Sequence, residues 1–153
     1  MRKLYLAYGS NLNRAQMRFR CPEAKVVGTA FLEDHRLLFR KSKSGFYLTI
    51  EPETGSKVPV AVWEVTKEDE RMLDRCEGFP TFYYKKEMLL PVKNICTGKT
   101  RRRRCFVYIM HENRPVGIPS RSYLRTCVNG YWDFGFDLNI LADAYERSKE
   151  NAQ

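Results

Sequence analysis

The chain has 153 residues, a length that suits one domain with its own hydrophobic core. Apolar residues make up 43% and charged residues 29%, which excludes a disordered chain, and no apolar run approaches the roughly 20 residues that a membrane-spanning helix needs. The N-terminus lacks the apolar run of a signal peptide, so a cytoplasmic protein is expected. The net charge is +9, and residues 85–125 account for all of it, with eleven basic side chains against two acidic ones.

The N-terminal segment predicts a strand followed by a short helix. Leu4–Tyr8 is apolar on both faces, which indicates a central strand. Gly9–Asn11 breaks this strand. Asn13 is then typical of the N-cap of a helix that ends at Arg20, just before Cys21-Pro22.

The next part of the chain predicts three strands. Residues 26–40 form one long or bent strand with a bulge at Gly28. Residues 46–50 and 58–65 form two more strands, separated by a turn through residues 52–55, which include Pro52 and Gly55.

A helix and a hairpin follow. Thr66–Asp69 resembles a capping box, with Asp in place of the usual Glu, and it opens a helix that ends at about Glu77. Gly78 suits the residue after the helix, where a left-handed backbone is common. Residues 82–92 and 105–110 predict two strands joined by a turn within residues 94–100.

The C-terminal part predicts two helices. One begins at Pro119-Ser120 and is ended or interrupted by Gly130, and the last spans residues 138–147. About six strands therefore precede or flank the helices without regular alternation, which favours a single α+β domain over residues 1–153. Several twisted strands in 110 residues indicate a small β-barrel or a strongly curled sheet.

Glu77 is a candidate general base. It lies at the C-terminal end of a predicted helix, where the helix dipole is partially negative, and an aromatic run follows it at residues 79–84. A carboxylate in such surroundings is expected to have a raised pKa, as a base working near neutral pH requires. A solvated glutamate in the last turn is the alternative.

Two further segments have the chemistry of a binding site. Tyr8, Gly9, Ser10, Asn11 and Leu12 form a strand-to-helix junction whose backbone N–H groups can hold a carboxylate or an oxyanion. Ordinary helix capping explains the same residues. Tyr123, near the start of a predicted helix, places a phenol either in a cleft or in the core.

Other sites are not expected. The five cysteines form no CxxC pair, and with only two histidines the sequence predicts free thiols and no zinc-like cluster. The run Arg101–Arg104 starts a strand, so alternate side chains face opposite ways and at most two join one patch. A charged edge strand explains that run, and no RNA-binding motif accompanies it.

Three segments together resemble the gamma-glutamylcyclotransferase family (AIG2-like). They are Tyr8–Leu12 after the first strand, Leu73–Gly78 after a central strand, and Pro119–Leu124 near the C-terminus. The resemblance extends over about residues 3–147. It implies a small mixed β-barrel flanked by helices, with the site at one mouth of the barrel and with no metal or cofactor.

The resemblance also implies a reaction and roles for residues. The family converts a γ-glutamyl amide into 5-oxoproline and a free amine or amino acid. Glu77 matches the catalytic glutamate of the family, Tyr8–Leu12 match the loop that cradles the substrate, and Tyr123 matches a tyrosine that lines the site. The expected partner is therefore a small γ-glutamyl substrate, with neither a membrane nor nucleic acid favoured.

The sequence departs from the family at Tyr131-Trp132, where small or polar residues are usual. Bulky rings there are expected to narrow the pocket, which leaves the leaving group open. The Tyr-Gly-Ser-Asn loop is closer to the branch acting on γ-glutamyl amino acids and antibiotic intermediates than to the γ-glutamylamine branch or the glutathione-specific branch.

Two alternatives remain at this stage. One is a non-catalytic module of the same fold that binds nucleic acid or an acidic partner through residues 85–125. The other is transfer of the acyl group to a different amine on the same scaffold. For the enzyme, Arg121 and Arg125 beside Tyr123 are expected to steer the carboxylate of the substrate.

Overall fold

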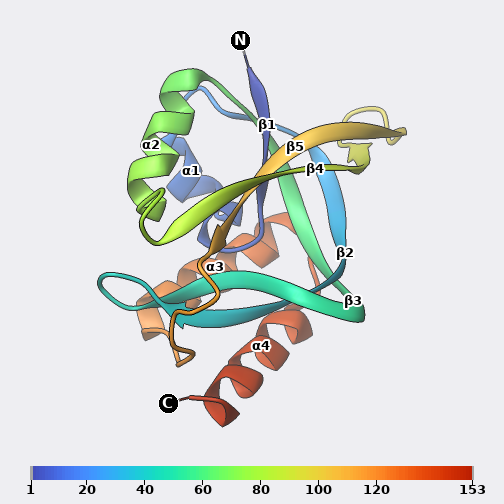
Figure 1. Cartoon of the computed structure of the whole chain (residues 1–153). Helices are drawn as coiled ribbons and strands as arrows, with labels where there is room; N and C mark the ends of the chain where they lie inside the picture. Colours follow the sequence, from blue (N-terminus) through green and yellow to red (C-terminus); the bar gives the residue numbers. More distant parts are fainter. Residues whose placement is uncertain (1, 153) are drawn as a thin grey trace.

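The computed structural model describes residues 2–152, which form a five-stranded closed barrel with helices on its outside (Figure 1). The barrel order is β1-β3-β2-β4-β5. The elements in chain order are β1 (Lys3–Ala7), the 3-10 turn η1 (Ser10–Leu12), α1 (Arg14–Arg20), β2 (Lys25–Lys41), β3 (Phe46–Val65), α2 (Lys67–Glu77), β4 (Tyr83–Asn94), β5 (Thr100–Met110), α3 (Arg121–Phe134) and α4 (Leu138–Glu150). The expected α+β fold with a small mixed barrel is confirmed.

Strand β1 is buried in the core of the fold. It pairs antiparallel with β3 and parallel with β5, so it closes the barrel between them. Its residues from Leu4 to Ala7 are all buried, as expected for a strand that is apolar on both faces. Tyr5 in this strand and Tyr8 just after its end both lie at one mouth of the barrel.

Strands β2 and β3 form one long hairpin, which corrects the prediction of a turn at Pro52 and Gly55. Those residues lie inside β3, where the hairpin bends. Asp34 adopts a φ of 57° and Gly55 a φ of 88°, and the Gly55 N–H donates to Asp34 Oδ1 at 2.9 Å. The register shifts between Glu33 and His35. The pairing of β2 with β3 skips residues 53–56 and resumes at Pro52, so the turn-forming residues produce a bulged bend rather than a chain reversal.

The bulge predicted at Gly28 is confirmed, and it closes the barrel. The register between β2 and β3 shifts between Val26 and Gly28. There β2 also meets β4, and a Cβ on Gly28 would lie 2.0 Å from the carbonyl oxygen of Lys93. Only glycine allows this close approach of two backbones.

Side-chain caps fix the ends of α1 and α2. The side chain of Asn13 accepts the N–H of Gln16 at 3.0 Å, which starts α1. Thr66 and Asp69 form the predicted capping box of α2. The two helices lie together beside the barrel (Figure 1).

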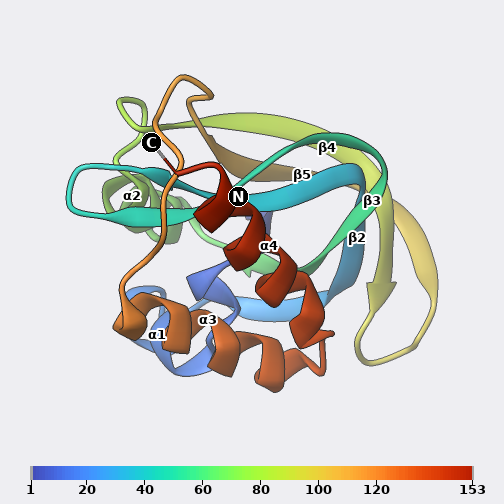
Figure 2. The same ribbon diagram turned by 90° about the horizontal axis from the view of Figure 1, so that it is seen from below.

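Helix α3 continues through Gly130 and ends at Gly135, so the prediction that Gly130 ends or interrupts it was wrong. Gly130 is buried where α3 crosses η1, and a Cβ there would lie 2.7 Å from Leu12 Cβ and from the backbone nitrogen of Asn13. Packing of α3 on the loop explains this glycine. Seen from below, α1 and α3 lie side by side (Figure 2).

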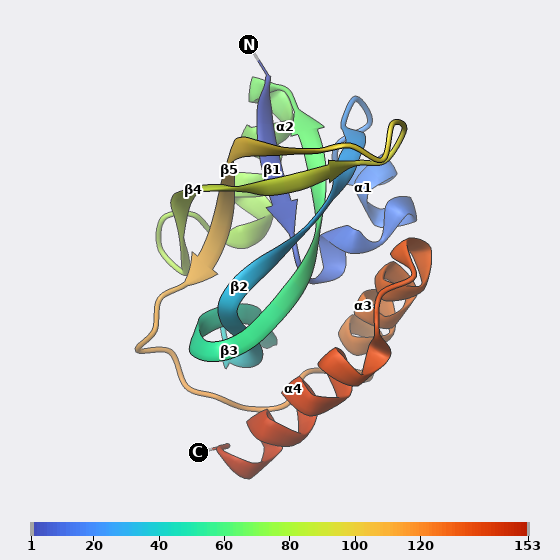
Figure 3. The same cartoon turned by 90° about the vertical axis from the view of Figure 1, so that its right-hand side faces the viewer.

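Helices α3 and α4 follow one another along one flank of the molecule (Figure 3). Helix α4 packs on β2, where Ser148 Oγ accepts the N–H of Phe39 at 3.0 Å. Within residues 2–152 no helix is long and apolar enough to cross a membrane. All five cysteines are free thiols, as predicted, and Cys21, Cys105 and Cys127 are buried.

Candidate active site

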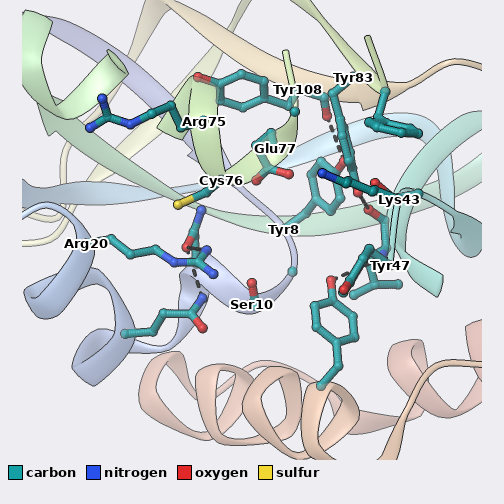
Figure 4. Close-up of a pocket in the computed structure, with 18 of the residues that line it drawn as sticks. Tyr8, Ser10, Arg20, Lys43, Tyr47, Arg75, Cys76, Glu77, Tyr83 and Tyr108 are labelled. Carbon is teal, nitrogen blue, oxygen red and sulfur yellow. Dashed lines mark hydrogen bonds between the residues drawn. The ribbon is translucent and has the colours of Figure 1, made fainter. Parts of the chain in front are cut away.

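A cavity of about 300 Å³ opens at one mouth of the barrel (Figure 4). Its wall comes from β1 and the loop after it, from α1 and the C-terminal end of α2, from the tip of the β2–β3 hairpin, and from β4, β5 and the start of α3. The structure thus brings together Glu77, Tyr123 and the junction from Tyr8 to Asn11, although these lie far apart in the sequence.

Glu77 is the last residue of α2 and points into the cavity (Figure 4). Gly78 caps the helix in the left-handed conformation, with a φ of 68°, as predicted. The Gly78 N–H donates to the carbonyls of Asp74 and Arg75, so the chain turns away from the helix axis directly after Glu77. Among the cavity-lining residues between 2 and 152, Glu77 is the sole carboxylate.

The environment of Glu77 favours its neutral form. Burial raises the pKa of the Glu77 carboxyl from 4.5 to about 7, and the positive charge of Arg20 opposes this rise. The expected direction is confirmed, with loss of solvent as the main cause. A carboxyl that titrates near neutral pH can both accept and return a proton under physiological conditions.

Six tyrosines form much of the remaining wall, and each hydroxyl already has a partner in the protein. They are Tyr5, Tyr8, Tyr47, Tyr83, Tyr108 and Tyr123. For example, Tyr8 donates to the carbonyl of Tyr108 at 2.7 Å, and Tyr83 donates to the carbonyl of Leu48 at 2.9 Å. Burial and then the charge of Glu77 raise the pKa of Tyr8 and of Tyr83. Tyr8 and Tyr83 therefore stay protonated at neutral pH.

The loop after β1 approaches the cavity through its backbone. A Cβ on Gly9 would lie 3.3 Å from the hydroxyl oxygen of Tyr123, so the loop and α3 nearly touch at this point. Ser10 lines the cavity and is partly exposed to it (Figure 4). Leu12 is fully buried under α3 and is not part of the wall, so it supports the loop from behind.

Asn11 has a buried side chain that is fully engaged by the protein. Its Nδ2 donates to the hydroxyl of Tyr5 at 2.9 Å, and its Oδ1 accepts from Gln16 at 3.1 Å and from Arg20 at 3.0 Å. The amide therefore fixes the position of Arg20, the cation that acts on the pKa of Glu77.

Tyr123 reaches the cavity from the first turn of α3, which Ser120 caps by accepting the Tyr123 N–H at 3.2 Å. Its hydroxyl accepts the N–H of Leu48 at 3.1 Å. Its ring packs edge to face on Tyr47, with ring centroids 4.9 Å apart. Tyr123 thus both lines the cavity and joins α3 to β3.

Three cations at the cavity were missed by the sequence analysis: Arg20, Lys43 and Arg75. They come from α1, from the tip of the β2–β3 hairpin and from α2, so no local motif groups them. Arg75 lies only two residues before Glu77, and this spacing was the one available signal. Figure 4 shows Arg20 and Lys43 on opposite sides of Glu77.

Two expectations about the pocket were wrong. Tyr131 is fully buried against Phe136, with ring centroids 5.7 Å apart, and Trp132 is 72% exposed, so neither ring narrows the cavity. Arg121 and Arg125 do not line it either. Successive residues of a helix point about 100° apart, and those that flank Tyr123 turn away from the site. The basic residues of segment 85–125 therefore contribute no charge to the cavity wall.

Comparison with known proteins assigns the family. The family model described as "Gamma-glutamyl cyclotransferase, AIG2-like" matches residues 5–133, a range that holds the loop after β1, Glu77 and Tyr123. The chain belongs to the gamma-glutamyl cyclotransferase, AIG2-like family. The expectation that the protein is an enzyme of this family is therefore confirmed.

Relatives support the family assignment along most of the chain. The human gamma-glutamylcyclotransferase is 31% identical over 144 residues, which cover 88% of this chain and 73% of the relative. The bovine gamma-glutamylcyclotransferase is 29% identical over 143 residues, with the same coverage of both chains. A solved structure named gamma-glutamyl cyclotransferase superposes with a TM-score of 0.74 at 27% identity, covering 94% of this chain and 86% of that one.

Proposed function

We propose that the protein cyclises γ-glutamyl compounds, releasing 5-oxoproline and a free amine or amino acid. The observation that carries this proposal is the single carboxyl group, with a pKa of about 7, that faces an otherwise tyrosine-lined cavity. The family and its named relatives support the same reaction.

In the proposed reaction the α-amine of the substrate attacks its own γ-carbonyl carbon. The new C–N bond closes a five-membered ring, and the original amide C–N bond breaks. Of the three hydrogens on the α-ammonium group, one stays on the lactam nitrogen and two end on the released amine, so no water is consumed. Ring closure within one bound molecule provides the proximity advantage.

Glu77 is the general acid and base of this proposal. Its carboxylate takes a proton from the α-amine and returns it to the departing nitrogen. A pKa of about 7 suits both transfers, because neither protonation state is strongly favoured at neutral pH. The loop of Tyr8–Asn11 and the guanidinium of Arg20 hold the γ-glutamyl half, and Tyr123 forms the wall behind it.

The test is release of 5-oxoproline from a panel of γ-glutamyl compounds, measured by mass spectrometry. The Glu77→Gln variant keeps the size and polarity of the side chain but cannot act as a base. It should lower the rate by roughly 10²–10⁴-fold. Glu68→Gln, an exposed change on the same helix, is the matched control. Near-normal turnover by Glu77→Gln, or no 5-oxoproline from any compound, would overturn the proposal.

A further inference from the structure

The charges around the cavity are unbalanced. Three cations line it, from Arg20, Lys43 and Arg75, against the single carboxyl of Glu77. Some basic side chains of the barrel form salt bridges; Lys85, for example, lies 2.8 Å from Glu70 and 3.0 Å from Asp74. Within residues 2–152, none of the three cavity cations forms a salt bridge.

The three cations differ in how firmly they are held. Arg20 is held by Asn11 Oδ1 at 3.0 Å and lies in the cavity wall on one side of Glu77 (Figure 4). Arg75 is exposed, and its guanidinium donates a hydrogen bond to the sulfur of Met72 at 3.9 Å. Lys43 is exposed at the hairpin tip and extends toward the cavity (Figure 4).

The number of carboxylates on a γ-glutamyl compound determines how well it complements the three cavity cations. A γ-glutamyl amine carries one carboxylate, a γ-glutamyl derivative of a neutral amino acid carries two, and one of an acidic amino acid carries three. Cationic leaving groups, such as polyamines, would face Lys43 and Arg75 and be repelled. Three cations without acidic partners complement three carboxylates.

We propose that Arg75 and Lys43 bind the carboxylates of an acidic leaving group, so that the preferred substrates are γ-glutamyl derivatives of aminodicarboxylic acids. Arg20 binds the γ-glutamyl half of the substrate, and Arg75 and Lys43 bind the leaving group. Guanidinium groups suit this task because they pair with carboxylates through two parallel hydrogen bonds. A cavity of about 300 Å³ is small among ligand sites, which suits a dipeptide. The inference rests on the proposed function.

Steady-state kinetics with matched substrates test the inference. γ-Glutamylglutamate and γ-glutamylglutamine differ by one charge at nearly constant size, and γ-glutamylethylamine has no carboxylate on its leaving group. We expect KM to be about tenfold lower for γ-glutamylglutamate than for γ-glutamylglutamine, which corresponds to about 1.4 kcal/mol for one added ion pair. The preference should weaken at high salt, because exposed charges are screened.

Substitutions at Arg75 and Lys43 test whether these residues cause the preference for γ-glutamylglutamate. Arg75→Gln and Lys43→Gln should each raise KM for γ-glutamylglutamate more than KM for γ-glutamylglutamine, and the double variant should remove the preference. Arg71→Gln on α2 and Lys41→Gln, two residues before Lys43, are controls, because each removes a nearby exposed cation that does not line the cavity. Equal kcat/KM for the two dipeptides, or an unchanged preference in the double variant, would overturn the inference while the proposed function stands.

A binding measurement separates the inference from catalysis. Isothermal titration of the Glu77→Gln protein with each dipeptide reports affinity without turnover. Tighter binding of γ-glutamylglutamate that disappears on adding Arg75→Gln and Lys43→Gln supports the inference, even if the chemistry differs from that proposed. Absence of 5-oxoproline from every substrate counts against the proposed function alone, and equal affinities for the two dipeptides count against the inference.

Discussion

The backbone N–H of Leu48 donates to the hydroxyl of Tyr123 at 3.1 Å, and this bond ties strand β3 to helix α3 across the wall of the cavity. Leu48 is itself buried, and its carbonyl accepts the hydroxyl of Tyr83 at 2.9 Å. One residue of β3 thus fixes two tyrosines of the site. The cavity wall is therefore held by bonds between elements that are distant in sequence.

Removing the Tyr123 hydroxyl should destabilise the fold. Tyr123→Phe leaves the buried N–H of Leu48 without its acceptor, which costs about 1–3 kcal/mol. Urea unfolding measures the change. Tyr145→Phe on α4 is the control, because that hydroxyl has no hydrogen bond to any residue between 2 and 152. Equal stability of Tyr123→Phe and the wild type would show that this bond contributes nothing to the fold.

Gly130 should be intolerant of a side chain. In Gly130→Ala the new Cβ would lie 2.7 Å from Leu12 Cβ and from the backbone nitrogen of Asn13, so α3 must move away from the loop. Overpacking of this kind typically costs about 1–3 kcal/mol. Thermal unfolding should show a lower Tm, whereas the adjacent exposed change Asn129→Ala should have little effect. A Tm equal to that of Asn129→Ala would contradict the close packing.

The raised pKa of Glu77 predicts how its replacement affects stability with pH. The carboxyl titrates at about 7 in the folded chain against an ordinary value of 4.5. Between these values the folded chain binds more protons than the unfolded chain, so this group lowers stability as pH rises toward 7. Glu77→Gln should therefore be more stable than the wild type at pH 8, and the gain should shrink toward pH 4. Urea unfolding across this range measures it, and a gain independent of pH would argue against the raised pKa.

Arg20 should set the pH dependence of turnover. Its charge opposes the effect of burial on Glu77, so Arg20→Gln should raise the pKa of Glu77 further. The acidic limb of the profile of kcat/KM against pH should then move to higher pH. The α-amine of the substrate also titrates, but it is the same for every variant, so it does not affect the difference between their pH profiles. Arg18→Gln, an exposed change on α1 that does not line the cavity, should leave the limb in place.

Features set by a few neighbouring residues were predictable from the sequence. The caps at Asn13, at Thr66 with Asp69 and at Gly78 act through hydrogen bonds or a left-handed backbone within one turn, and the structure has all of them. The bulge at Gly28 was predicted from a glycine inside a strand, although the close approach of Lys93 that requires this glycine is a distant contact. These local features determine where α2 ends, and therefore where Glu77 is placed.

Features set by distant contacts were not predictable. Gly130 is typical of a helix end, but its contact with Leu12 lies more than 100 positions away in the sequence. Pro52 and Gly55 are typical of a turn, yet pairing with β2 continues on both sides of them. The convergence of Arg20, Lys43 and Arg75 depends on three separate elements. In each case tertiary packing outweighs the local preference.

The three cavity cations all lie at the margins of their elements. Arg20 ends α1, Arg75 belongs to the last turn of α2, and Lys43 lies in the turn between β2 and β3. The barrel strands contribute uncharged aromatic side chains to the cavity wall. The ends of α1 and α2 and the turn between β2 and β3 contribute the positive charge. Ligand preference is consequently separable from folding at Arg75 and Lys43, because both side chains are exposed and their charges can be exchanged without a change to the buried residues of the barrel.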